Sequence, residues 1–230
     1  TEFLLCSSDC EAMSIADLLA METGAAEKFQ QTWLGYTESQ GHPALRKEIA
    51  KIYETIQPEE ILVHTGAEEA IFLFMLAALK ENDHIIVHAP HYQSLSEIAK
   101  GMGCMVSHWR AREENNWVLD LDELRHLMRS STKAIVINTP HNPTGYLMSK
   151  PDFEAVNKFA QENNLLLFCD EVYRESEYDL SLRLPAGADM GEHAVSLGVT
   201  SKTYGLAGLR IGWIATKNKT FYEKMAGLKD

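Results

Sequence analysis

The sequence contains few basic residues for its length and no cluster of them. Its 230 residues include 33 Asp and Glu against 21 Lys and Arg, which gives a formal net charge of −12. Nucleic-acid phosphates are bound by clustered Lys and Arg, and no basic run occurs anywhere in the sequence. We therefore expect no nucleic-acid partner, and we expect the acidic surface to favour solubility.

Long hydrophobic runs are also missing. The longest, residues 70–79, lies between Glu69 and Lys80 and is too short to cross a bilayer, so we expect no membrane partner. The opening TEFLLCSS has no basic segment ahead of its apolar patch, so we expect no signal peptide. The four cysteines form no CxxC pair and no Cys/His metal spacing. This pattern favours free thiols in a reducing cytoplasm, and no metal site.

Two common phosphate-binding motifs are absent as well. Gly101 and Gly103 lack the third glycine of a dinucleotide-binding fingerprint because position 106 is Val, and no GxxxxGK sequence occurs. The nine histidines show no metal spacing, so most of them are expected to be structural or exposed. Only His91 and His141 lie beside the motifs described below, where they are candidates for substrate contact.

What the sequence does contain is an alternation of short apolar runs with helical patterns. Helical spacing or a first-turn proline marks residues 43–56 and 151–163, and residues 67–80 are apolar nearly all round, as in a helix buried under a sheet. Residues 14–23 form one helix in a first stretch that does not join the alternation. The alternation predicts an α/β protein with a mostly parallel sheet. The seven predicted strands are residues 61–64, 85–88, 105–108, 134–138, 165–169, 194–198 and 211–215.

The segment TSKTYGLAGLR near the end of the sequence contains the clearest candidate for chemistry. Lys202 follows the apolar strand AVSLG and precedes a glycine-rich turn. It is therefore predicted to project from the end of a strand, where open α/β sheets bind ligands. An isolated lysine after a serine is otherwise usually a surface residue. A lysine in this position can form an imine with an aldehyde and can later act as a general base.

Other segments contain groups that complement such a lysine around pyridoxal 5'-phosphate (PLP). Asp170 ends the strand LLLFC, where its carboxylate would keep a pyridine nitrogen protonated; the alternative is a helix N-cap. Asn142 in NTPHNPTG and Tyr173 in DEVY would hydrogen-bond the phenolic oxygen, although the prolines around Asn142 are also turn signals. Arg210 would bind the phosphate.

These segments, in this order, resemble the class I/II aminotransferases, the PLP-dependent enzymes of fold type I that include aspartate aminotransferase. The resemblance implies a seven-stranded, mostly parallel sheet sandwiched by helices, with an N-terminal arm. Residues 1–42 would contact the substrate pocket, the small domain and a partner subunit, and residues 43–230 would form the PLP-binding large domain. Family members continue past the arginine matched by Arg210. The large domain would therefore be incomplete at its C-terminal end, and the C-terminal small domain would be absent.

The resemblance also implies a phosphate site at the start of the apolar helix. Gly66, Ala67 and Glu68 open this helix, and their free amides would bind an anion. A capping box between Thr65 and Glu68 is the simpler interpretation of the same residues. The anion site and the capping box are compatible if the Glu68 carboxylate turns away while its backbone amide faces the phosphate.

Three further cofactor contacts follow from the resemblance. Tyr92 in APHYQSL matches the ring that stacks on the pyridine, and on its own would be a core or rim tyrosine. Ser201, or Thr200, would supply a hydroxyl to the phosphate, because Val199 stands where many relatives have Ser. Tyr36 matches a tyrosine that reaches the neighbouring subunit's phosphate, which implies a homodimer; otherwise it is an ordinary loop aromatic.

The function implied by the resemblance is amino-group transfer between an amino acid and a 2-oxo acid. PLP would be held as a Schiff base on Lys202, and the catalytic residues would be Lys202, Asp170 and Tyr173. PLP-dependent β-lyases, decarboxylases and cyclases of the same fold keep these residues. The stretch CSSDCEAMS replaces a glycine-containing opening that normally lines the substrate pocket, so this alternative stays open. A non-catalytic PLP-binding module or an inactive fragment is the alternative of a different class.

Overall fold

Seven strands form a single sheet in the order β1-β7-β6-β5-β4-β2-β3. The structure is a computed structural model and describes residues 7–230. Strands β2 to β6 pair in parallel, whereas β7 is antiparallel to both β1 and β6. The predicted seven-stranded, mostly parallel sheet is confirmed. The strands are β1 Ile61–His64, β2 His84–Ala89, β3 Met105–Arg110, β4 Thr132–Asn138, β5 Leu166–Asp170, β6 Ala194–Val199 and β7 Gly212–Ala215.

Helices cover both faces of the sheet. Because side chains alternate along a strand, Ile85 and Val87 of β2 join the core under α4, α5 and α8, while Ile86 joins the core under α6 and α7. A third core, around Trp213 of β7, packs against α3. The helices are α1 Ile15–Ala20, α2 Ala25–Gln30, α3 Pro43–Ala50, α4 Gly66–Ala78, α5 Ser94–Gly101, α6 Leu121–Leu127, α7 Lys150–Glu162 and α8 Lys219–Lys229.

Two predicted helices are shorter than their sequence patterns. The helix expected over 14–23 ends at Ala20, and the one expected over 43–56 ends at Ala50. After Ala50 the backbone N–H groups of Glu54 and Thr55 donate to the carboxylate of Asp189, 3.0 and 2.8 Å away. These contacts replace helical hydrogen bonds, and Tyr53 remains buried without a continuous helix.

The start of α4 corrects another prediction. The Thr65 side chain forms no capping hydrogen bond; instead the Thr65 N–H donates to the Glu69 carboxylate. The proposed capping box of Thr65 with Glu68 is therefore wrong. Farther along, α4 is buried on one side only: Phe74 is fully buried against Phe168, with ring centroids 4.3 Å apart, whereas Phe72 is 48% exposed.

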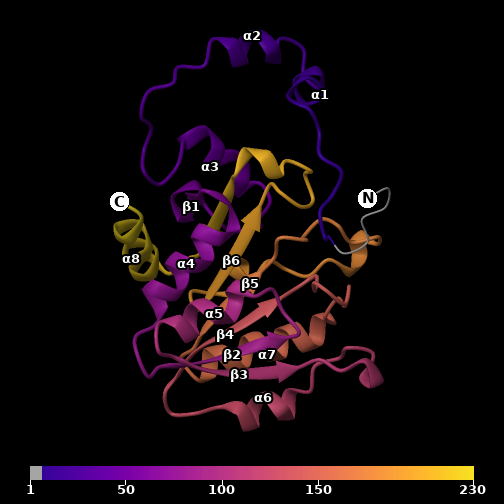
Figure 1. Cartoon of the computed structure of the whole chain (residues 1–230), viewed down its shortest axis with the longest axis vertical. Helices are drawn as coiled ribbons and strands as arrows, with labels where there is room; N and C mark the ends of the chain where they lie inside the picture. Colours follow the sequence, from indigo (N-terminus) through magenta and orange to yellow (C-terminus); the bar gives the residue numbers. More distant parts are fainter. Residues whose placement is uncertain (1–6) are drawn as a thin grey trace.

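The N-terminal arm lies apart from the sheet (Figure 1). Helices α1 and α2 contain no buried residue, and Trp33, Leu34 and Tyr36 are 79%, 94% and 101% exposed. The stretch before α1 nevertheless contacts the turn after β6, where the Met13 N–H donates to the Gly205 carbonyl over 3.4 Å. Within residues 7–230, no helix has both the length and the apolar character required to span a membrane.

The packing of α4 generates a stability prediction. We expect Phe74→Ala to lower the free energy of unfolding by about 3–5 kcal/mol, because it leaves a cavity between α4 and the sheet. Phe72→Ala, on the exposed side of the same helix, is the matched control and should cost about 1 kcal/mol or less. Urea unfolding of the two variants measures both values, and equal losses would contradict this packing.

Candidate functional site

The carboxyl ends of β1, β2, β4, β5 and β6 and the start of β7 lie at one edge of the sheet. The connections after β2, β4, β5 and β6 leave from this edge because these strands are parallel, and the chain enters antiparallel β7 there. A cavity of about 200 Å³, which we call the cleft, lies at this edge between these connections and the start of α4. Ligands in open α/β sheets bind at such a position. The cleft is lined by Ser8, Asp9, Ala67, Glu68, Ile71, Tyr92, Asn138, Asn142, Asp170, Val172, Tyr173, Val199, Ser201, Lys202, Ala207 and Arg210.

Most of the residues singled out from the sequence meet in this cleft. Gly66 lies next to it, against the Arg210 side chain. Tyr36 is elsewhere: it is fully exposed on the arm and does not line the cleft. Its predicted contact with a neighbouring subunit stays a prediction. The predicted residues that line the cleft are Ala67, Glu68, Tyr92, Asn142, Asp170, Tyr173, Ser201, Lys202 and Arg210.

Lys202 lies in the turn that follows β6. Its Nζ donates to a carboxylate oxygen of Asp9 at 2.9 Å and to the Ser8 hydroxyl at 3.3 Å. It also lies 5.9 Å from the centre of the Tyr173 ring, within cation–π range. Burial alone would lower the pKa of Lys202, but the hydrogen bond to Asp9 and the nearby negative charge raise the pKa overall. The amine is therefore a cation in this arrangement.

Asp170 is the last residue of β5 and is buried, with 5% of its surface exposed. Burial raises the pKa of its carboxyl to about 7, and the Val172 N–H that donates to it at 3.2 Å opposes this shift. The N-cap alternative is not what the structure contains, because no α-helix begins after β5 before α8. A buried carboxyl that lines a cleft and lacks a cationic partner in contact is suited to binding a positively charged group.

Asn138 is a residue of the cleft that the sequence analysis missed. It ends β4 opposite Asp170, and its side-chain amide donates to the Asp170 carbonyl over 3.0 Å. Its side-chain oxygen accepts from the Asn142 N–H at 2.7 Å. Asn138 therefore ties the Asn142 loop to the end of β5. The available signal was a buried polar residue at the end of the apolar run AIVIN, which could also mark an ordinary strand end.

The start of α4 and the turn before β7 form a positively charged corner of the cleft. A side chain at Gly66 would come within 2.5 Å of the Arg210 guanidinium, and one at Gly212 within 2.7 Å of the Gly66 backbone. Two glycines thus let the guanidinium lie against the first turn of α4. Among the described residues, Arg210 forms no ion pair, and its Nη1 donates only to the Ala207 carbonyl at 3.0 Å. The helix start and the guanidinium together favour an anion.

The two hydroxyls considered for the phosphate differ in their hydrogen bonds. Thr200 uses its hydroxyl within the turn, donating to the carbonyls of Leu206 and Ile211. The Ser201 Oγ is buried at the cleft and has no hydrogen-bond partner within residues 7–230. A buried polar atom without a partner is costly unless a ligand or water supplies one.

Glu68 and Tyr92 form the outer wall of the cleft. The Glu68 carboxylate accepts a hydrogen bond from the Ser94 hydroxyl at 3.1 Å and raises the pKa of the Tyr92 phenol. Glu68 lines the cleft. The expectation that its carboxylate turns away is therefore not met, because Ser94 and Tyr92 hold it beside the cleft.

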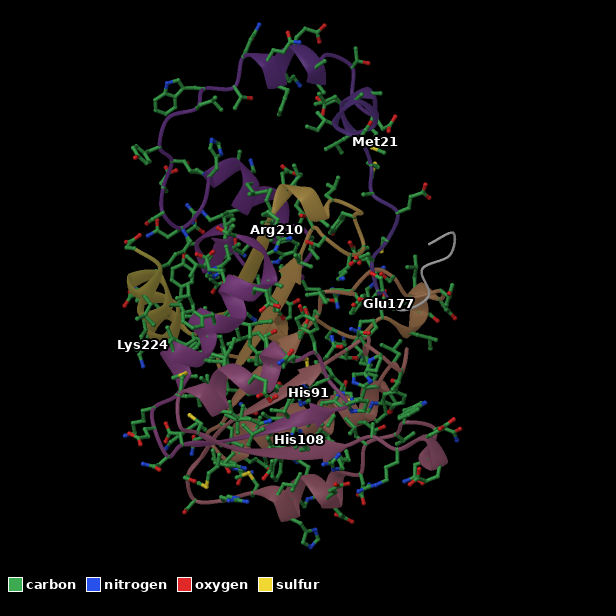
Figure 2. All side chains as sticks on the ribbon, viewed as in Figure 1. Met21, His91, His108, Glu177, Arg210 and Lys224 are labelled. Atoms are coloured by element: carbon green, nitrogen blue, oxygen red, sulfur yellow. The ribbon has the colours of Figure 1, made fainter. Side chains whose placement is uncertain are left out.

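The two histidines flagged beside the motifs have structural contacts. His141 donates from Nε2 to the Pro90 carbonyl at 2.7 Å and accepts from the Thr144 hydroxyl at 2.6 Å. It thereby joins the loops that carry Tyr92 and Asn142. His91 contacts His108 through ring nitrogens 3.3 Å apart; both residues are labelled in Figure 2. Neither side chain lines the cleft.

The fold and the cleft define an α/β protein whose cleft contains a lysine amine and a buried carboxyl beside a corner that favours an anion. The chain belongs to the class I and II aminotransferases, since the model of that family matches residues 3–230. Its sequence is 30% identical over 209 residues to an aspartate aminotransferase of Sulfurisphaera tokodaii, and this match covers 88% of the chain and 52% of the relative. It is also 30% identical to kynurenine–oxoglutarate transaminase 1 of Mus musculus, with 83% and 50% covered.

Solved structures agree with the family. The structure of a PLP-dependent aminotransferase from Streptococcus suis superposes with a TM-score of 0.90 at 33% sequence identity, covering 97% of this chain and 60% of that one. An aspartate aminotransferase from Thermus thermophilus gives a TM-score of 0.83 at 26% identity, with 96% and 57% covered. The fold type I architecture is thus confirmed. The chain spans about half the length of the curated relatives it matches.

The burial of Asp170 predicts how stability depends on pH. Its pKa of about 7 in the folded chain is above the value of 3.8 expected when unfolded. The folded state therefore binds more protons between these values, and the free energy of unfolding falls as the pH rises from about 4 to 7. We expect Asp170→Asn to raise this free energy by on the order of 2 kcal/mol at pH 8, and to change it little at about pH 3, where the carboxyl is protonated in both states.

Urea unfolding of the cofactor-free chain at several pH values measures this effect. The exposed Asp122→Asn variant is the control and should keep the wild-type pH dependence. Part of the slope will persist in Asp170→Asn, because burial also raises the pKa of Glu171 to about 7. An unchanged slope in Asp170→Asn would show that the Asp170 carboxyl is not desolvated as described.

Proposed function

We propose that this chain is the cofactor-binding part of a PLP-dependent aminotransferase that moves an amino group between an amino acid and a 2-oxo acid. One observation carries the proposal. A single cleft unites the Lys202 amine, the buried Asp170 carboxyl and the Arg210 guanidinium at the start of α4. Each of these groups complements a different part of PLP: the aldehyde, the pyridine nitrogen and the phosphate.

The residues present fit the phosphate of PLP. Arg210 has no carboxylate partner within the described chain, and the amides that open α4 face the same corner. The unpartnered Ser201 hydroxyl would gain an acceptor there. A dianionic phosphate would satisfy all three, which is why we assign Gly66, Ala67, Glu68, Ser201 and Arg210 to it.

The residues present also fit the ring of PLP. Burial raises the pKa of the Asp170 carboxyl to about 7. A pyridinium nitrogen beside it would lower this pKa again and keep the carboxyl ionised. Asn142 and Tyr173 line the cleft on the Lys202 side and would hydrogen-bond the phenolic oxygen. Tyr92 would cover the open face of the ring.

Bound PLP supplies an aldehyde and an electron-accepting ring. Lys202 is the residue of the cleft that can bind the aldehyde covalently, and its free amine can afterwards hold or release a proton at the substrate Cα. For that role the amine has to be neutral, so the hydrogen bond from Lys202 to Asp9 has to be broken first. Tyr173, next to Lys202, is placed to assist the same proton transfer.

Transamination is favoured over the other PLP reactions by the relatives. Those named above are an aspartate aminotransferase and a kynurenine–oxoglutarate transaminase, and another match is a glutamate–pyruvate aminotransferase of Haemophilus influenzae. No specific contact in the cleft favours β-elimination, decarboxylation or cyclisation. The assay that separates these reactions is product analysis of the complete protein with PLP, an amino acid and a 2-oxo acid. Transamination yields new amino acid and new oxo acid in equal amounts, whereas ammonia or carbon dioxide release would contradict it.

Three expectations about the whole protein are proposals as well: its division into parts, its homodimer and its location. We propose that residues 1–42 act as an arm and 43–230 as an incomplete large domain, and that the arm contacts a second copy in a homodimer. The exposed apolar side chains of Trp33, Leu34 and Tyr36 support such a contact. A cytoplasmic location is supported by Cys10, Cys104 and Cys169, which form no disulfide in the described part of the chain.

The role of Lys202 can be tested without turnover. After incubation with PLP and reduction with borohydride, we expect peptide mass spectrometry to find the label on Lys202. The Lys202→Ala variant should lose both this label and the associated visible absorption, because no other lysine lines the cleft. Lys219→Ala removes an exposed lysine at the start of α8; it is the matched control and should label like the wild type. Labels spread evenly over surface lysines would refute the assignment.

The phosphate assignment predicts the behaviour of Arg210. We expect Arg210→Gln to weaken PLP binding by about 10- to 100-fold, the value of a charge-assisted contact. Absorbance titration of the cofactor-free chain measures it, and inorganic phosphate should compete less well in the variant. The control is Arg125→Gln on α6, whose guanidinium pairs with Asp122 away from the cleft. If both variants bind PLP equally, Arg210 does not hold the phosphate.

A further inference from the structure

The N-terminal stretch brings one carboxylate into the cleft that no cofactor role uses. Asp9 lines the cleft and accepts a hydrogen bond from the Lys202 amine at 2.9 Å. Its side chain is 72% exposed, whereas that of Lys202 is 21% exposed. Asp9 therefore stands at the mouth of the cleft, where an incoming substrate can reach it, and Lys202 lies farther inside.

The proposed reaction removes the positively charged partner of Asp9, the Lys202 ammonium. The proposed function requires a neutral Lys202, either covalently occupied or acting as a base. The other cation of the cleft, Arg210, is taken up by the phosphate at the start of α4. The Asp9 carboxylate is then left beside the substrate position without a positive partner from the described chain. A carboxylate in this situation favours a cation and repels a second carboxylate.

A second hollow continues from the cleft on the Asp9 side. This groove, of about 460 Å³, shares Ser8, Asn142 and Tyr173 with the cleft. Its lining includes Glu177 and Asp179 but no lysine or arginine. Glu177, labelled in Figure 2, is compensated by Arg183 at 3.2 Å, whereas Asp179 accepts only from the hydroxyl and N–H of Ser181 among described residues.

The charges of the groove have the same sign as that of Asp9. His141 is the one histidine in its lining, and burial lowers the pKa of this imidazole, so it adds no positive charge near neutral pH. A substrate side chain that extends from the cleft into the groove thus passes Asp9 and then meets a surface without basic groups. A distal carboxylate would find no counter-ion there among the described residues.

We infer that the preferred amino donor carries a second positive charge on its side chain, as a diamino or guanidino acid does, and that Asp9 binds this charge. The inference rests on the proposed function and adds the substrate class to it. The geometry that carries it is the hydrogen bond from the Lys202 ammonium to Asp9, which shows that this exposed carboxylate can bind a cation at the mouth of the cleft.

The first experiment compares half-reactions of the complete protein loaded with PLP. Lysine, ornithine and arginine are mixed with it in single turnovers, beside norleucine, alanine, aspartate and glutamate, and the cofactor absorbance is followed. We expect lysine to react at least about tenfold more efficiently than norleucine, which has nearly the same shape without the charge. Asp9→Asn should remove most of this preference and affect alanine much less, whereas Asp9→Glu should restore part of it.

The second experiment measures binding without chemistry. Calorimetry compares 5-guanidinopentanoate, which has no amine to react, with hexanoate on the same loaded protein. The guanidino compound should bind more tightly to the wild type by about tenfold, and this difference should shrink in Asp9→Asn. Glu27→Gln removes an exposed carboxylate on α2, outside the cleft, and should behave like the wild type in both experiments.

The outcomes distinguish a failure of this inference from a failure of the proposed function. If no amino acid changes the cofactor spectrum, the proposed function falls, and the inference falls with it. If alanine or glutamate reacts as well as lysine, and Asp9→Asn leaves the ratios unchanged, the function stands and the inference is overturned. If Asp9→Asn slows every amino acid equally and leaves the calorimetric difference intact, Asp9 acts on Lys202 rather than on the substrate, which also overturns it.

Discussion

The pairing between the carboxyl ends of β4 and β5 is the constraint on which the site depends. Asn138 and Asp170 lie opposite each other, and the Asp170 carbonyl accepts from both the Asn138 side chain and the Thr139 N–H. The same Asn138 holds the Asn142 amide. One polar side chain at a strand end thus fixes two loops of the cleft. Because β2 pairs in parallel with β4, and β6 pairs in parallel with β5, the loops after β2 and β6 open at the same edge.

The cleft contains charges that the fold alone leaves uncompensated. Asp170 is buried at the cost of a raised pKa, Arg210 has no carboxylate partner, and the Ser201 hydroxyl has no acceptor within residues 7–230. The buried Asp170 carboxyl and Ser201 hydroxyl are unfavourable in the cofactor-free chain, and all three groups would gain a partner from a molecule that carries a phosphate and a basic ring nitrogen. Stability given up at a binding site in this way is a common compromise between folding and function. The ion pair between Asp9 and Lys202 is a smaller example, because it stabilises the free site and has to open for catalysis.

Local patterns were sufficient for most of the architecture. The apolar runs located all seven strands to within two residues at each end. All strands except β3 are buried along most of their length, and such strands are apolar nearly throughout and bounded by turns. Helix ends were less predictable. The pattern over 43–56 is helical in its spacing, but Asp189, far away in the sequence, captures the N–H groups of Glu54 and Thr55 and ends the helix early. The Thr65 capping box failed for a similar reason, since Glu69 competes for the same helix start.

The sequence by itself determined the sheet and the family, and its motifs, with the resemblance they carry, identified nine of the sixteen residues that line the cleft. It did so because strand periodicity and the motif residues are local properties of the chain. Only the tertiary structure decided which groups touch. It left the Ser201 hydroxyl, and not that of Thr200, without a partner among the described residues, and it added Asn138 to the cleft. It gave His141 and His91 contacts to other residues outside the cleft. It also brought Asp9 into contact with Lys202, almost the whole length of the chain away. Such contacts depend on the register of distant segments and on competition for hydrogen bonds, and neither is encoded in the spacing of neighbouring residues.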